Sequence, residues 1–149
     1  MPDRLYLSPP HIGPDELALE YTRCMMTALL FLNADPERVL MLGLGGGSLV
    51  KFLLRWCSGC AMDVAELRAS VVEVAQRYFA LPDTHQRLHV HVGDGSNFIQ
   101  QTPPTPWDLV LLDLTMPGLG GIEVAKRLAR KPSPPAVIFV TAHESFAVE

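Results

Sequence analysis

Five short apolar segments recur along this sequence, and each is separated from the next by a stretch with the spacing of an amphipathic helix. The segments are Arg38–Leu44, Ala61–Leu67, Arg87–Val92, Trp107–Leu114 and Ala136–Thr141. Strands that are apolar along their whole length are typical of a parallel sheet covered on both faces. Since crossovers between parallel strands are right-handed, the pattern predicts a doubly wound α/β sheet of five parallel strands.

The stretches between the strands predict the helices that cover this sheet. A first helix is expected from Asp15, which can cap it, to about Leu32. The other helices are expected at Gly46–Trp56, Ser70–Phe79, about 96–101 and Ile122–Arg130. Residues 1–14 are rich in proline and are expected to be irregular. A length of 149 residues predicts one domain, spanning 1–149.

A glycine-rich turn follows the first predicted strand and opens the next helix. Gly43 permits a tight turn, Gly45 lets a ligand approach the backbone, and Gly47 allows close packing of the helix. The exposed N–H groups and the helix N-terminus favour polar or anionic atoms of a ligand. The order of strand, turn and helix makes this pattern more specific than glycines alone.

Two acidic residues end the next two predicted strands. Glu66 lies 23 positions after Gly43, where a carboxylate that binds a ribose is expected. Asp94 and Gly95 end the third strand, where a carboxylate or the backbone can reach an adenine edge. Three strand ends would then form one cleft for a nucleoside. The alternative is that the glycines only turn the chain and the acids are surface helix caps.

Composition and charge exclude several classes of function. The net charge is −4 and the isoelectric point about 5.7, which argues against a nucleic-acid binder. No apolar run approaches the roughly 20 residues of a membrane span, and the first residues lack a secretion signal. Three cysteines cannot form a disulfide framework. We therefore expect a cytoplasmic protein without nucleic-acid or membrane partners.

Two further pairs of residues are weak candidates for chemistry. Cys57 and Cys60 form a CxxC pair, but it lies at the C-terminal end of a predicted helix, whereas redox pairs lie at a helix N-terminus. Gly59 is expected to end that helix. His89 and His91 alternate on one strand and point to the same face, but no third ligand is evident. We expect no metal site.

Residues of about 16–113 resemble the spermidine synthase-like branch of class I S-adenosylmethionine-dependent methyltransferase folds. The resemblance lies in LEYTRCMMTALLFL, RVLMLGLGGGSLVKFL, AELRASVVEVAQRYFALP, RLHVHVGDG and WDLVLLD. It implies binding of S-adenosylmethionine or its decarboxylated form, with a polyamine as a candidate second substrate. Gly43, Gly45 and Gly47 would cradle the ligand, Glu66 would bind the ribose, and Asp94 with Gly95 the adenine. Asp113 matches the catalytic aspartate, which orients and helps deprotonate an amine.

Residues of about 107–149 carry a second resemblance, to the receiver domains of response regulators of the LytTR type. Asp113 and the following LTMPG match the phosphoacceptor strand and its loop, and Thr141 with Ala142 matches the switch threonine and its small neighbour. A receiver also holds Mg²⁺ with an acidic pair after its first strand. Leu44 to Gly47 occupy that place here and contain no carboxylate. Phosphotransfer signalling is therefore not expected.

The two resemblances overlap on WDLVLLD, which indicates a natural or engineered chimera. Its spermidine synthase-like part would span 15–113 and its receiver-like part 114–149. In both families the aspartate strand lies beside the first strand, so we expect a Rossmann-like sheet of order 3-2-1-4-5. Aminopropyl transfer is expected to be impaired, because Met116-Pro117 stands where the family carries a further acidic residue. A chimeric fold without activity is the alternative. The apolar fifth strand would be a sheet edge that favours a homodimer.

Overall fold

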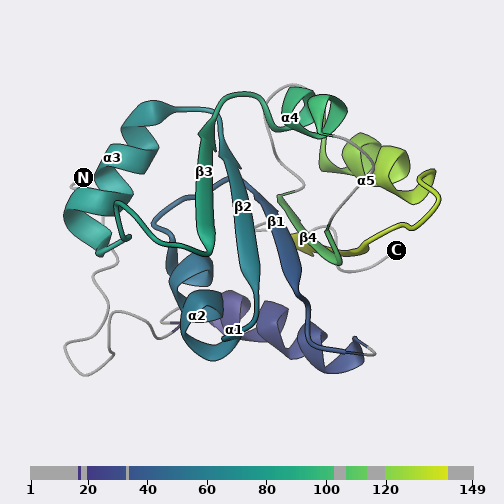
Figure 1. Cartoon of the computed structure of the whole chain (residues 1–149), viewed down its shortest axis with the longest axis horizontal. Helices are drawn as coiled ribbons and strands as arrows, with labels where there is room; N and C mark the ends of the chain where they lie inside the picture. The colour runs from purple at the N-terminus through teal and green to yellow at the C-terminus, as the bar shows by residue number, and fades with distance from the viewer. Residues whose placement is uncertain (1–16, 18–19, 33, 103–106, 114–119, 141–149) are drawn as a thin grey trace.

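A single parallel sheet organises the part of the chain that the computed structural model describes, namely residues 17, 20–32, 34–102, 107–113 and 120–140. Its strands are β1 (Arg38–Leu42), β2 (Ala61–Glu66), β3 (Leu88–Val92), β4 (Leu109–Asp113) and β5 (Ala136–Val140). They lie in the order β3-β2-β1-β4-β5, and every pair is parallel (Figure 1). The predicted fold class and strand order are confirmed.

Helices fill the connections between the strands, close to where the sequence predicts them. They are α1 (Glu20–Thr27), the 3-10 helix η1 (Ala28–Phe31), α2 (Ser48–Trp56), α3 (Ala69–Phe79), α4 (Gly95–Gln101) and α5 (Gly121–Ala129). The first helix differs most from its prediction. It tightens into 3-10 geometry over its last turn, and the start expected at Asp15 lies outside the described residues.

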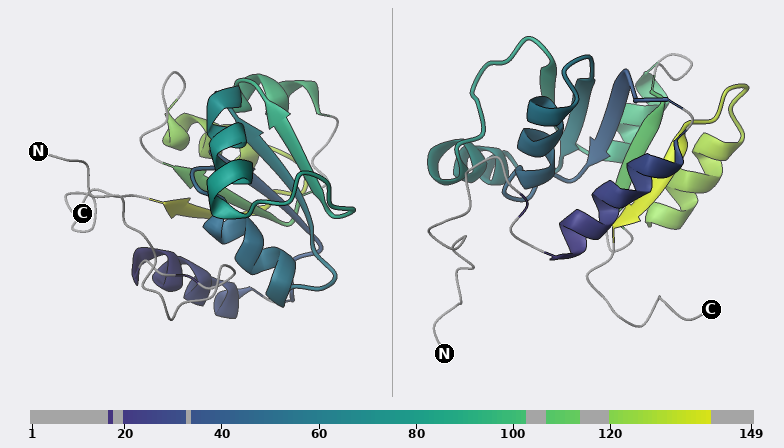
Figure 2. Two further views of the ribbon diagram at one scale, coloured as in Figure 1. Left: turned by 90° about the vertical axis from the view of Figure 1, so that its left-hand side faces the viewer. Right: turned by 90° about the horizontal axis from the view of Figure 1, so that it is seen from below.

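Helices cover both faces of the sheet, as the side views of Figure 2 show, and an apolar layer lies on each face. On one face α1, α2 and α3 pack on the strands through side chains that include Met26, Leu53 and Ala75. On the other face α4 and α5 pack through Ile99, Val124 and Leu128. Both faces of the central strand β1 are buried, because alternate residues of Val39–Leu42 enter opposite layers. This double burial explains why the strands are apolar along their whole length.

The CxxC segment forms the C-terminal cap of α2 and the turn that follows it. The helix ends at Trp56 with Cys57 as its cap, so Gly59 is not the residue that ends it, and Gly59 lies in the turn that follows. Arg87 closes this end, because its guanidinium donates to the carbonyls of Leu54, Cys57 and Cys60. Burial raises the pKa of the Cys60 thiol to about 11, which is the opposite of thiolate activation.

None of the described helices has both the length and the apolar character needed to cross a membrane.

Candidate functional site

The glycine-rich turn leaves the end of β1 in a conformation that glycine adopts readily. Gly43, Gly45 and Gly47 have φ angles of +89°, +54° and +73°, which are strained for residues with a Cβ. A Cβ at Gly43 or Gly45 would enter open space, whereas one at Gly47 would lie 2.9 Å from the Leu81 side chain. The turn therefore presents bare backbone at its first two glycines and packs tightly at its third.

The Glu66 carboxylate lies against this turn. Its Oε2 accepts a hydrogen bond from the Leu44 N–H at 2.9 Å, and its Oε1 accepts one from the Arg68 N–H at 3.0 Å. Only 7% of the residue is exposed. A buried carboxylate is costly unless it is hydrogen-bonded, and these two backbone donors offset part of that cost. The end of β2 is thus joined to the glycine turn through a side chain.

Backbone hydrogen bonds bring the third strand end to the same place. The Gly43 N–H donates to the Ala65 carbonyl at 2.9 Å, and the Gly93 N–H donates to the Glu66 carbonyl at 2.8 Å. These bonds continue the ladder beyond the last residues of β1 and β3. The C-terminal ends of β1, β2 and β3 therefore lie side by side at one end of the sheet, which we call the strand-end edge.

Asp94 stands at this edge as the cap of α4. Its Oδ1 accepts a hydrogen bond from the Asn97 N–H at 2.9 Å, which leaves Oδ2 with no partner among the described residues. A Cβ at Gly95 would lie 2.9 Å from the Leu42 side chain, so glycine allows α4 to approach β1 closely. The helix-cap alternative holds for Asp94, and the cap uses only one of its two oxygens.

Asp113 is the last residue of β4, paired in register with Val140 of β5. Leu112 pairs with Leu42 of β1, so the backbone of Asp113 follows directly beside the start of the glycine turn. Its side chain lies outside the described residues. The backbone brings Asp113 to the same sheet edge as Glu66 and Asp94.

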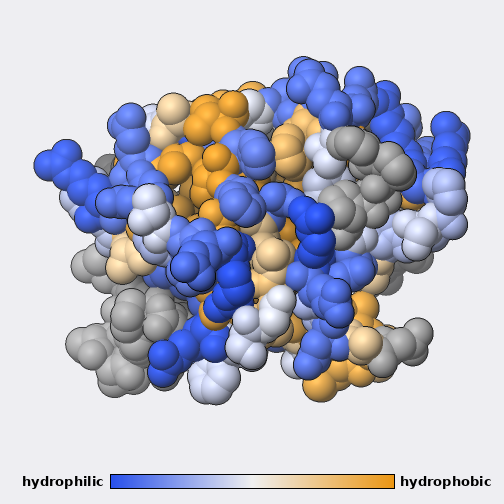
Figure 3. Space-filling model, viewed as in Figure 1, coloured by the Kyte–Doolittle hydropathy of each residue, from blue (hydrophilic) through white to orange (hydrophobic). Residues whose placement is uncertain are grey.

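Exposed apolar side chains at this edge were not singled out from the sequence. Leu67 follows Glu66 and is 51% exposed, and Val92 ends β3 and is 56% exposed. Phe79, at the end of α3, lies close to Gly46 of the turn. Figure 3 shows apolar surface between α3 and the strands β2 and β3. Their place beside the last residues of strands is the signal that could have identified Leu67 and Val92.

Of the two histidines of β3, His91 belongs to a different cluster. His91 stacks on Phe98, with ring centroids 4.2 Å apart, and its Nε2 lies 3.9 Å from the Asp63 carboxylate. Asp63 also accepts a hydrogen bond from the Trp107 indole at 2.7 Å. The described residues contain no group of three or more His, Cys, Asp or Glu side chains that could hold a metal ion.

Comparison with known proteins finds a family match over the C-terminal part of the chain. The family model described as response regulator receiver domain matches residues 64–149, which is more than half of the chain. The chain belongs to this family. The positive alginate biosynthesis regulatory protein of Pseudomonas aeruginosa is 62% identical over 67 residues, which are 45% of this chain and 27% of that protein. Membership of the LytTR type stays a prediction.

The same receiver-family chain is also similar to spermidine synthases and methyltransferases. The polyamine aminopropyltransferase of Neisseria meningitidis is 29% identical over 119 residues, which are 80% of this chain and 43% of the enzyme. Human methyltransferase-like protein 13, solved in complex with SAH, aligns with a TM-score of 0.59 and 28% identity over 68% of this chain and 50% of its own. The chain thus spans less than half the length of the aminopropyltransferases it matches. The predicted mixture of two families is confirmed.

Proposed function

We propose that the ends of β1, β2 and β3 bind the nucleoside part of S-adenosylmethionine or its decarboxylated form. The observation that carries the proposal is the buried Glu66 carboxylate, which is hydrogen-bonded to the Leu44 N–H of the glycine turn. Transfer of an aminopropyl group to a polyamine is impaired or lost. The likeness to an aminopropyltransferase and to a methyltransferase that binds SAH supports the class of ligand.

The Glu66 carboxylate suits a ribose because it keeps unused acceptor capacity. A carboxylate offers about four acceptor sites, and the two backbone N–H groups occupy two of them. The remaining sites can accept hydrogen bonds from the two ribose hydroxyls. Bare backbone at Gly43 and Gly45 leaves room for the ligand beside them.

The base has complementary partners at the same strand ends. The Oδ2 of Asp94 can accept a hydrogen bond from the adenine amino group while Oδ1 continues to cap α4. The exposed side chains of Leu67 and Val92 offer apolar surface for the faces of the base. In this proposal Gly95 supplies backbone beside the adenine.

Binding is tested by titration calorimetry with S-adenosylmethionine, its decarboxylated form and methylthioadenosine. The decisive variant is Asp94→Asn, because asparagine caps helices as well as aspartate does but places an amide donor where the adenine amino group needs an acceptor. We expect about tenfold weaker binding, the cost of one lost charge-assisted hydrogen bond. Asp83→Asn, an exposed loop residue, is the matched control. Absence of heat and of a melting shift at millimolar ligand would refute the proposal.

Catalysis is tested separately, with decarboxylated S-adenosylmethionine and putrescine. In the proposed role Asp113 orients the attacking amine and accepts its proton. Product formation by the parent chain is expected to be at or near background. If product forms and Asp113→Asn forms it at the same rate, the proposed role of Asp113 is wrong.

A receiver function is the second candidate, and the family match over residues 64–149 favours it. Asp113 would be the phosphoacceptor, but Leu44 to Gly47 supply no carboxylate for Mg²⁺. Incubation with acetyl phosphate and Mg²⁺, followed by intact mass, separates the two functions. We expect no added phosphate. A mass increase that Asp113→Asn abolishes would favour the receiver.

The fifth strand supports the proposal of a homodimer. Among the described residues β5 pairs with β4 along one edge only, and Phe139 on it is 40% exposed. An apolar edge strand is a template for pairing with a second copy. Sedimentation velocity is expected to show a dimer that Phe139→Lys converts to monomer. A monomeric parent at high concentration would remove this part of the proposal.

A further inference from the structure

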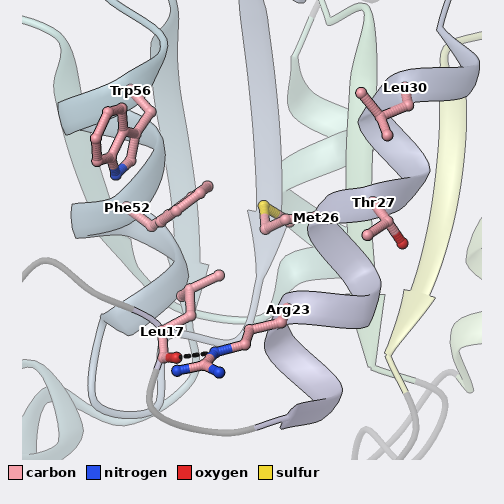
Figure 4. A pocket seen from close by; sticks show the side chains of 7 residues that line it. All are labelled: Leu17, Arg23, Met26, Thr27, Leu30, Phe52 and Trp56. Atoms are coloured by element: carbon pink, nitrogen blue, oxygen red, sulfur yellow. Dashed lines mark hydrogen bonds between the residues drawn. The ribbon is translucent and has the colours of Figure 1, made fainter. Parts of the chain in front are cut away.

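A groove lies between α1 and α2, and its described lining includes none of the residues at the ends of β1, β2 and β3. It has a volume of about 460 Å³, which is in the range of small-molecule sites. Its described lining is Leu17, Arg23, Met26, Thr27, Leu30, Phe52 and Trp56. Figure 4 shows the two aromatic side chains on α2 along one wall and Met26 of α1 across from them.

The walls of this groove are apolar and partly uncovered. Phe52 and Trp56 lie one helical turn apart, with ring centroids 6.2 Å apart and ring planes tilted by 42°. Trp56 is 66% exposed and Leu30 is 83% exposed, whereas Met26 is buried and forms part of the floor. Exposed large apolar side chains around a groove mark a binding surface.

One end of the groove carries a positive charge. Of its seven described lining residues, Arg23 is the charged one. Its Nε donates to the Leu17 carbonyl at 2.7 Å, which directs the guanidinium toward that end and leaves its terminal N–H groups as donors. None of the ion pairs among the described residues involves Arg23. A carboxylate is the group that a guanidinium fork matches best.

We propose that this groove binds an amphipathic carboxylate, with its acid group on Arg23 and an aryl-alkyl body between Phe52, Trp56 and Met26. The charge lies beside Leu17, and the apolar walls continue along α1 and η1 to Leu30 over roughly 10 Å (Figure 4). This length fits an aromatic ring joined to the carboxylate by a few methylene groups. The acid would bind independently of the nucleoside.

Three ligands with one apolar body test the proposal: 4-phenylbutanoate, 4-phenylbutan-1-ol and 4-phenylbutylamine. Each is titrated into the parent chain by calorimetry and by tryptophan fluorescence, in which exposed Trp56 responds and buried Trp107 does not. We expect saturable binding of the acid, at least tenfold weaker binding of the alcohol, and none of the amine. Equal affinity for acid and alcohol would overturn the proposal.

Variants of the chain separate the charge from the apolar walls. Arg23→Gln is expected to reduce acid affinity to that of the alcohol and to leave alcohol affinity unchanged. Phe52→Ala weakens both ligands. Arg55→Gln, an exposed arginine on α2 that does not line the groove, is the matched control and leaves acid affinity unchanged. If Arg55→Gln weakens the acid as much as Arg23→Gln does, the binding is general charge attraction and the proposal fails.

Two further measurements keep the test decisive. Arg23→Lys retains the charge but removes the planar fork and the Nε hydrogen bond, so its acid affinity should lie between those of the parent and of Arg23→Gln. Saturating methylthioadenosine should leave the acid titration unchanged. Loss of acid binding in Arg23→Lys, or displacement of the acid by methylthioadenosine, would overturn the assignment to this groove.

Discussion

The carboxyl ends of β1, β2 and β3 and the half of the sheet formed by β4 and β5 are fixed by different kinds of contact. At the ends of β1, β2 and β3, a buried carboxylate and three glycines in the left-handed region fix the geometry. On β4 and β5, α5 is held by apolar side chains such as Val124 and Leu128 against Val110 and Leu112. The first region depends on individual hydrogen bonds, and the second depends on volume and apolarity.

This difference explains how parts resembling two families can share one sheet. A seam made of apolar contacts tolerates exchange of one element for another if total volume and patterning are kept. A buried hydrogen-bonded carboxylate does not, because one lost partner leaves a costly polar group. The overlap of the two resemblances predicts a join at β4, whose buried side chains make apolar contacts on both faces of the sheet. The hydrogen bonds of the glycine turn run to Glu66 and Ala65 of β2, which lies on the opposite side of β1 from β4.

The largest effect on stability is expected from the receiver-like side. Leu128→Ala removes a fully buried side chain of α5 and should lower the free energy of unfolding by about 2–5 kcal/mol. Urea unfolding measures the change, and Ile122→Ala, at an exposed position of the same helix, should stay within about 0.5 kcal/mol. Affinity for methylthioadenosine in the folded variant should equal that of the parent. A changed affinity would mean that the two sides are coupled.

A smaller loss of stability is expected from Glu66→Gln, together with loss of the nucleoside. In the parent, each oxygen of the Glu66 carboxylate accepts a hydrogen bond from a backbone N–H group. Glutamine replaces one of these oxygens with an NH2 group, so one backbone N–H faces a donor and loses its hydrogen bond. An unsatisfied buried group of this kind costs about 1–3 kcal/mol. Glu73→Gln, at an exposed position of α3, is the control for charge removal. If Glu66→Gln binds methylthioadenosine like the parent, Glu66 has a structural role only.

The sequence predicted the sheet because each strand is buried on both faces. Val39–Leu42 shows this most directly, since every residue is apolar and alternate ones enter opposite layers. The positions of Glu66 and Asp94 were also predictable, because Glu66 ends β2 and Asp94 follows the end of β3 in a parallel sheet. The hydrogen bond between Glu66 and Leu44 was not, since it joins residues 22 positions apart through a turn whose path depends on three φ angles.

Other features depend on tertiary contacts that leave no local pattern. The 3-10 geometry of Ala28–Phe31 follows a stretch whose spacing continues that of α1, so periodicity alone extends the helix. The helix α2 ends at Trp56, before Gly59. The carbonyls at this end accept hydrogen bonds from Arg87, which is about 30 positions away in the sequence. The exposure of Leu67 and Val92 likewise reflects the open strand ends and not their residue type.

Gly45→Ala should separate binding from stability on the nucleoside side. Alanine at φ +54° costs about 1–2 kcal/mol of backbone strain, and its Cβ meets no atom of the protein. That Cβ would occupy space that the ligand needs, so methylthioadenosine affinity should fall at least tenfold. Gly47→Ala is the contrasting variant, because its Cβ meets Leu81 and not the ligand. Retained affinity in Gly45→Ala would place the nucleoside elsewhere.

The smallest change in stability is expected from breaking the ion pair on α5, in the receiver-like part of the sheet. Glu123 and Arg127 lie one turn apart on α5, with Oε1 and Nε separated by 3.5 Å and both side chains more than a third exposed. Such a pair contributes about 0.3–0.5 kcal/mol. Glu123→Gln should therefore shift urea unfolding by no more than that, and the shift should shrink in high salt because ions screen exposed charges. A loss as large as that of Glu66→Gln would show that polar contacts, and not apolar volume, hold α5, and the contrast between the two sides of the sheet would disappear.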